Sequence, residues 1–164
     1  MKLIIIADNL GGGGARFGHF LINSIAKKIG WNNLIILGNH RVGLDIKNIE
    51  QSFKYVELQN SWIPRFLRRQ IFVKKYSKGA NVLNLTNFPI GTYFLPIKKE
   101  ICIIHSAYFF SLPGNLFSLN VKFILKVIIA RRLLFNILRF FSTAPQTVFV
   151  VQTPWMKSLA KKSL

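Results

Sequence analysis

Short apolar runs alternate with longer amphipathic segments along the chain. The first helical segment shows the pattern well, because Phe17, Leu21 and Ile25 recur every four residues and Gly30 ends the run. The short apolar runs predict strands over residues 2–7, 33–37, 53–58, 81–85, 100–105 and 147–152. The amphipathic segments predict helices over residues 15–29, 63–77, 118–141 and 154–162.

This alternation predicts the fold class. Nearly continuous apolar strands between helices are typical of a parallel sheet that is covered on both faces. We therefore expect residues 1–164 to form a single α/β domain, Rossmann-like, with three layers and a mostly parallel sheet. Ligands in such folds bind beyond the carboxyl ends of the strands, where segments 8–14, 87–91 and 105–113 are expected.

The amino-acid composition limits the classes of partner that this chain is expected to bind. Apolar residues make up 51% of the chain, and 23 Lys and Arg against 5 Asp and Glu give a net charge of +18. Such a balance suits a polyanion, either nucleic acid or an anionic membrane surface. The few carboxylates leave little for a hard metal ion, and we expect neither a metal nor a cofactor. The lone Cys102 lies in an apolar run, so we expect a core position and a reducing, cytoplasmic setting.

Four consecutive glycines, Gly11 to Gly14, follow the first predicted strand and precede a helix. This order predicts a row of backbone N–H groups at a helix N-terminus, where an anion can bind. The dinucleotide pattern G-x-G-x-x-G fails, because the sixth position counted from Gly11 is Arg16. A P-loop fails as well, since His19 follows Gly18. The loop therefore favours a phosphate-type ligand, and the alternative is a purely structural turn.

Three segments carry a family resemblance. They are the glycine run from Asn9 to Arg16, the strand that ends in His105-Ser106, and the strand and helix start over residues 147–157. In this order they resemble the N-terminal, acceptor-side domain of GT-B-fold glycosyltransferases, especially the family-4 group of retaining enzymes. The resemblance spans the whole chain and implies transfer of a sugar from a nucleotide-sugar donor to a sugar or lipid-linked acceptor.

The resemblance also implies roles for single residues. The positions that map to the donor diphosphate lie in the glycine loop and just after it. They are Gly12, Gly13, Gly14 and Arg16. His105 maps to the group that faces the transferred sugar, and its alternative is a structural histidine at a strand end. Asn87 and Tyr108, on neighbouring loops, are weaker acceptor-side positions.

Enzymes of this family have a second domain that binds the nucleotide sugar and carries two glutamates separated by seven residues. No Glu follows Glu100 in this sequence. The resemblance therefore implies an acceptor-side half that acts in cell-surface glycan assembly, such as lipopolysaccharide or capsule, with a missing or separate donor domain. The alternatives are a non-catalytic subunit that anchors a catalytic partner to the membrane, and a basic polyanion-binding domain.

Segments 63–78 and 118–141 mix basic with large apolar residues, which is typical of helices that lie on a membrane surface. We expect peripheral contact with the cytoplasmic face, and the alternative is a pair of core helices whose basic side chains reach solvent. A spanning helix is not expected, because Pro113 interrupts one apolar stretch and Arg131 the other. Nucleic acid is a less favoured partner, since no zinc, helix-turn-helix or RNP pattern is present.

Overall fold

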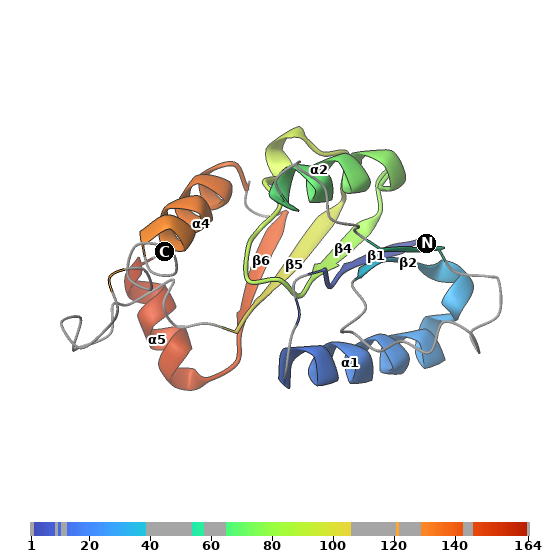
Figure 1. The fold of residues 1–164 in the computed structure, drawn as a ribbon, viewed down its shortest axis with the longest axis horizontal. Coiled ribbons are helices and arrows are strands. Elements are labelled where there is room, and N and C mark those ends of the chain that lie inside the picture. The colour runs from blue at the N-terminus through green and yellow to red at the C-terminus, as the bar shows by residue number, and fades with distance from the viewer. Residues whose placement is uncertain are drawn as a thin grey trace.

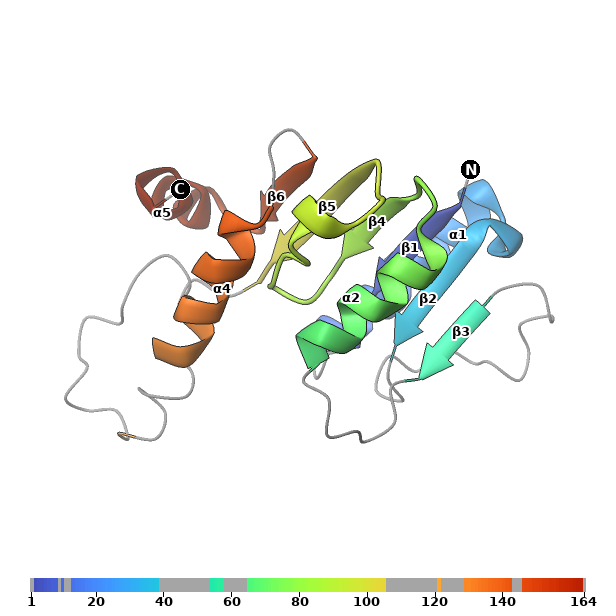
Figure 2. The same cartoon turned by 90° about the horizontal axis from the view of Figure 1, so that it is seen from above.

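The computed structural model describes residues 2–8, 10, 13–38, 54–57, 65–105, 121, 129–142 and 146–163. Six strands form one sheet in the order β3-β2-β1-β4-β5-β6, and every pair is parallel. The strands are β1 (Leu3–Ile6), β2 (Leu34–Gly38), β3 (Lys54–Glu57), β4 (Asn81–Asn84), β5 (Lys99–Ile104) and β6 (Thr147–Val151). The expected Rossmann-like α/β fold is confirmed, with β3 at one edge beside β2 and β6 at the other (Figure 2).

Helices flank both faces of this sheet. They are α1 (Gly13–Ile29), α2 (Arg65–Tyr76), α4 (Arg131–Phe140) and α5 (Pro154–Ser163), with short 3-10 turns η1 (Trp31–Asn33) and η3 (Thr92–Phe94). Helix α1 lies on one side of the sheet, and α2 and α4 lie on the other (Figure 1). Helix α4 falls inside the helix predicted over residues 118–141, of which 118–120 and 122–128 lie outside the described residues.

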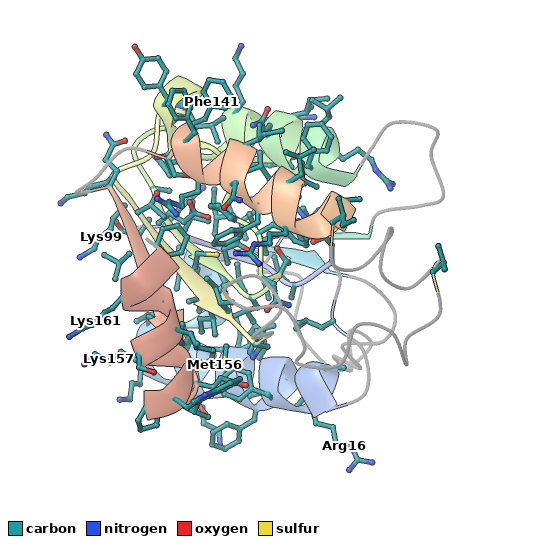
Figure 3. All side chains as sticks on the ribbon, turned by 90° about the vertical axis from the view of Figure 1, so that its left-hand side faces the viewer. Arg16, Lys99, Phe141, Met156, Lys157 and Lys161 are labelled. Atoms are coloured by element: carbon teal, nitrogen blue, oxygen red, sulfur yellow. The ribbon has the colours of Figure 1, made fainter. Side chains whose placement is uncertain are left out.

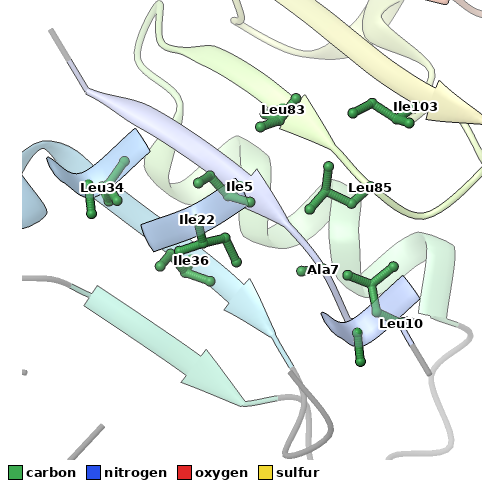
Figure 4. Packing of buried hydrophobic residues seen from close by; sticks show 11 residues of the cluster. Ile5, Ala7, Leu10, Ile22, Leu34, Ile36, Leu83, Leu85 and Ile103 are labelled. Atoms are coloured by element: carbon green, nitrogen blue, oxygen red, sulfur yellow. The ribbon is translucent and has the colours of Figure 1, made fainter. Parts of the chain in front are cut away.

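Strand β1 shows why its sequence is apolar at every position. Ile5 faces a cluster that includes Ile22 of α1, whereas Ile4 faces a cluster that includes Phe72 and Val73 of α2 (Figure 4). Successive strand residues point to opposite faces, so a strand that is covered twice needs apolar side chains throughout.

A third cluster joins β5 to α4 and α5. Cys102 is fully buried in it and packs near Phe135 of α4 and Met156 of α5. Burial raises the pKa of the Cys102 thiol well above its ordinary value, so this cysteine stays protonated. The predicted core position of Cys102 is confirmed.

The strand order also defines where a ligand fits. The chain runs from β1 outward to β2 and β3, and then crosses to the other side of β1 to form β4. The carboxyl ends of β1 and β4 are therefore the point at which the winding direction reverses, and open sheets of this kind bind ligands there. Asp8, Asn87 and His105 follow β1, β4 and β5 at that edge.

Candidate functional site

The N-terminal turn of α1 forms one wall of the candidate site. Gly13 is the first helical residue, and the first turn contains no acidic side chain. The first N–H groups of any helix have no partner within the helix, so they favour an anion at this end. A Cβ on Gly14 would meet only the Leu10 side chain, at the ordinary distance of 3.7 Å. Packing among the described residues therefore does not require glycine at position 14.

Leu10 fixes how closely this turn approaches the sheet. Its side chain is buried in the cluster that contains Ala7 and Leu85, at the ends of β1 and β4. A Cβ on Gly18 would overlap a terminal methyl group of Leu10, so the absence of a side chain at Gly18 lets Leu10 pack directly against the helix. The start of α1 is thereby held against the strand ends.

His105 lies directly after β5 and contacts α1 at Phe17, just beyond the first turn of the helix. The Phe17 ring of α1 packs edge-on against the imidazole, with ring centroids 5.7 Å apart and an interplanar angle of 74°. The side chain of Gln152, which follows β6, hydrogen-bonds to the imidazole. Nε2 of His105 is buried and has no hydrogen-bond partner among the described residues.

Burial determines the charge of this imidazole. Desolvation lowers the pKa of His105 from 6.5, and the hydrogen bond with Gln152 raises it by a smaller amount. His105 is therefore mostly neutral at pH 7, so one ring nitrogen is a hydrogen-bond donor and the other an acceptor.

Asn87 connects the end of β4 to the end of β5. Its side-chain Oδ1 accepts a hydrogen bond from the backbone N–H of His105. Its backbone has a φ of 68°, in the left-handed region that Asn tolerates better than most residues. The structure thus brings Asn87 and His105 together, as their positions at the same sheet edge predict.

The other predicted site residues are Arg16, Gly12 and Tyr108. Arg16 is exposed, and its side chain extends away from the fold in Figure 3. Gly12 and Tyr108 lie outside the described residues. The structure therefore places Gly13, Gly14, Asn87 and His105 around one sheet edge and directs the Arg16 side chain toward solvent.

An ion pair near this edge was not predicted. Nε of Arg69, on α2, lies 2.8 Å from Oδ1 and 3.1 Å from Oδ2 of Asp8, and both side chains are almost fully buried. Asp8 was visible only as a carboxylate after the first strand, and Arg69 only as one of several basic residues on a helix. Their separation of 61 positions left no sequence signal for the pair.

A second buried network surrounds Glu100. Its Oε1 accepts hydrogen bonds from Nδ2 of Asn84 at 2.8 Å and from the backbone N–H of Ile90 at 3.2 Å. Its Oε2 lies 3.3 Å from the Thr147 hydroxyl on β6. Burial raises the pKa of Glu100 to about 7, although these hydrogen bonds and the charge of Arg69 oppose the shift. The sequence shows a lone glutamate at the start of a predicted apolar strand. It does not show which residues hydrogen-bond to that glutamate.

The described residues contain neither a metal-binding cluster nor a helix that could span a membrane. No group of three or more His, Cys, Asp or Glu side chains in that part of the chain is arranged to hold a metal ion. Within the same residues, every helix is too short or too polar to cross a bilayer.

Comparisons with protein-family models, with curated proteins and with solved structures found no match for this chain. The geometry of the site is therefore the basis for assigning its function.

Proposed function

We propose that this chain is the acceptor-side half of a glycosyltransferase of the GT-B type, similar to family 4. It would transfer a sugar from a nucleotide-sugar donor during assembly of a cell-surface glycan, together with a donor-binding domain outside residues 1–164. One observation carries this proposal. The start of α1, Asn87 and His105 lie at the carboxyl edge of a parallel sheet, next to the point where its winding reverses, and His105 contacts both Asn87 and Phe17 of α1.

The α1 turn suits the diphosphate of a nucleotide-sugar donor. A leaving nucleoside diphosphate gains negative charge as the glycosidic bond breaks, and fixed N–H groups stabilise that charge without reorganising. Gly14 is compatible with this role, because only the Leu10 side chain, among the described residues, comes near the position of a Cβ there. Absence of a Cβ lets a phosphate approach the backbone closely.

His105 suits the sugar that is transferred. Its imidazole is held by Phe17 and Gln152, and its neutral form leaves the buried Nε2 able to hydrogen-bond a hydroxyl group. Asn87 would keep His105 in place through the backbone N–H. In this proposal Gly12, Arg16 and Tyr108 keep the donor-side and acceptor-side roles that the resemblance implies.

Reconstitution tests the proposal. The DNA that follows the codon of Leu164 would be read in all frames, and any donor-type domain found there would be co-expressed with this chain. We expect sugar transfer from a radiolabelled nucleotide sugar to lipid extracts, about 100-fold slower for His105→Gln and unchanged for the control His19→Gln on α1. Transfer that is insensitive to His105→Gln would contradict the assigned site.

A binding measurement tests the phosphate wall alone. Pyrophosphate added to the ¹⁵N-labelled chain should shift the backbone amide signals of Gly13 and Gly14 before those of η1, at the opposite end of α1. Equal shifts at both ends would indicate nonspecific attraction to a basic protein. Activity that requires the partner but survives every change at this site would favour the alternative, a non-catalytic anchoring subunit.

A further inference from the structure

Helices α2 and α4 lie on the same side of the sheet (Figures 1 and 2), and each exposes large apolar side chains. Ile71 of α2 is 59% exposed, and Phe140 of α4 is 83% exposed. Ile137 and Leu133, one and two turns before Phe140, are exposed as well, so the outer stripe of α4 is mostly apolar, with Asn136 as its exposed polar residue.

The loop between β4 and β5 joins these two helices into one surface. Nε2 of Gln70 on α2 donates a hydrogen bond to the Ile90 carbonyl at 2.9 Å. The backbone N–H of Tyr93 donates to the Phe141 carbonyl, at the end of α4, also at 2.9 Å. Gly91 lies between them, because a Cβ there would be 3.3 Å from Nε2 of Gln70 and 3.5 Å from Cβ of Phe141. Tyr93, 66% exposed, lies in this loop beside the end of α4 and adds an aromatic side chain to the exposed apolar residues of the two helices. We call this surface, with Ile71, Tyr93, Ile137 and Phe140 at its centre, the α2–α4 face.

The charged residues near the α2–α4 face indicate which kind of partner binds to it. Lys74 and Lys75 form part of the last turn of α2, both exposed, and Lys78 follows them. Neither α2 nor α4 contains an acidic residue. Two of the chain's five carboxylates, Asp8 and Glu100, are buried, which removes them from the surface.

We infer that the α2–α4 face is a docking surface for an anionic lipid membrane. Exposed Ile and Phe side chains would enter the interface between headgroups and acyl chains, Tyr93 would lie at headgroup level, and the lysines would meet anionic headgroups. Exposed apolar side chains mark protein interfaces as well as membrane contacts, and lysines without acidic neighbours on α2 and α4 favour an anionic lipid surface as the occupant. This inference goes beyond the proposed sugar transfer and does not depend on it.

Vesicle co-sedimentation of the full chain tests the inference. We expect binding to vesicles of phosphatidylcholine with 30% phosphatidylglycerol, and much weaker binding to pure phosphatidylcholine. Each lysine at an anionic surface contributes about fivefold to partitioning, so Lys74→Gln with Lys75→Gln should weaken binding about 25-fold. The matched control is Lys27→Gln with Lys28→Gln, an exposed pair in the last turn of α1 on the opposite side of the sheet.

A second pair of variants tests the apolar part. Phe140→Ser should weaken binding about tenfold or more, whereas Phe20→Ser on α1, where Phe20 is 69% exposed, should change it less than about twofold. Both side chains are exposed, so both variants should fold.

Three results would overturn the inference. They are a chain that stays in the supernatant, equal loss of binding in the α1 lysine control, and equal binding to neutral vesicles. A mobility shift with duplex nucleic acid in the absence of vesicle binding would assign the face to a different polyanion. Because sedimentation needs no sugar transfer, these results are independent of the reconstitution assay.

Discussion

At the scale of single residues, Asn87 has two separable functions. Its backbone occupies the left-handed region, and its side chain caps the His105 N–H. Asn87→Gly keeps the backbone conformation and loses the side-chain hydrogen bond to His105, which should cost about 1 kcal/mol of unfolding free energy. Asn87→Ala should cost about 2–3 kcal/mol, because alanine also resists a positive φ.

Urea denaturation measures both Asn87 costs, and amide exchange at His105 should accelerate in each variant. Equal stability of the two variants would show that the backbone conformation of Asn87 carries no cost.

His105 offers a direct measurement at the same scale. Burial lowers the pKa of its imidazole, and the hydrogen bond with Gln152 opposes the shift. An NMR titration should therefore give a midpoint below 6.5, and Gln152→Ala should move it lower still. The direction in which pH changes the unfolding free energy depends on which state, folded or unfolded, binds the proton more tightly. The unfolded chain binds this proton more readily, so the contribution of His105 to stability falls as the pH drops below 6.5. A midpoint that rises in Gln152→Ala would contradict this arrangement.

At the scale of elements, the pair of Asp8 and Arg69 fastens α2 to the end of β1. Because both side chains are buried, removal of one leaves an uncompensated charge in the interior. Arg69→Met should lower the unfolding free energy by about 3–5 kcal/mol. The double variant, Asp8→Asn with Arg69→Met, should lose clearly less than the sum of the two single losses. Additive losses in chemical denaturation would show that the two groups do not stabilise each other.

At the scale of the whole molecule, Glu100 links β4, the loop after it, β5 and β6. Its pKa is raised from 4.5 to about 7 in the folded chain, so the fold favours the protonated acid. Between these values the folded state binds more protons than the unfolded state. Its contribution to stability is therefore complete below pH 4.5 and is lost as the pH rises through 7, for a total of about 3 kcal/mol.

Glu100→Gln tests this linkage. The glutamine amide keeps an oxygen toward Asn84 and Ile90 and offers an N–H toward the Thr147 hydroxyl, much as the protonated acid does. We expect the variant to match the parent near pH 5 and to exceed it in melting temperature near pH 8. A difference between the two chains that does not vary with pH would contradict a raised pKa for Glu100.

Local structure and the type of fold follow from patterns along the sequence. Apolar runs such as that of β1 predicted strands covered on both faces, and the helix start after the glycines was predicted within two residues. The position of Asn87 and His105 at a shared edge followed as well, because parallel strands place their carboxyl ends together. These features depend on periodicity and on neighbours along the chain.

Which distant groups meet depends on how the segments pack in the folded chain. The partner of Asp8 lies 61 positions away, and the hydrogen bonds of Glu100 come from three separate segments. The outer stripe of α4 likewise became recognisable only once its buried side was known, since its sequence is apolar in several directions. Burial, pairing and exposure are properties of contacts between segments, and a pattern along one chain does not encode which segments will touch.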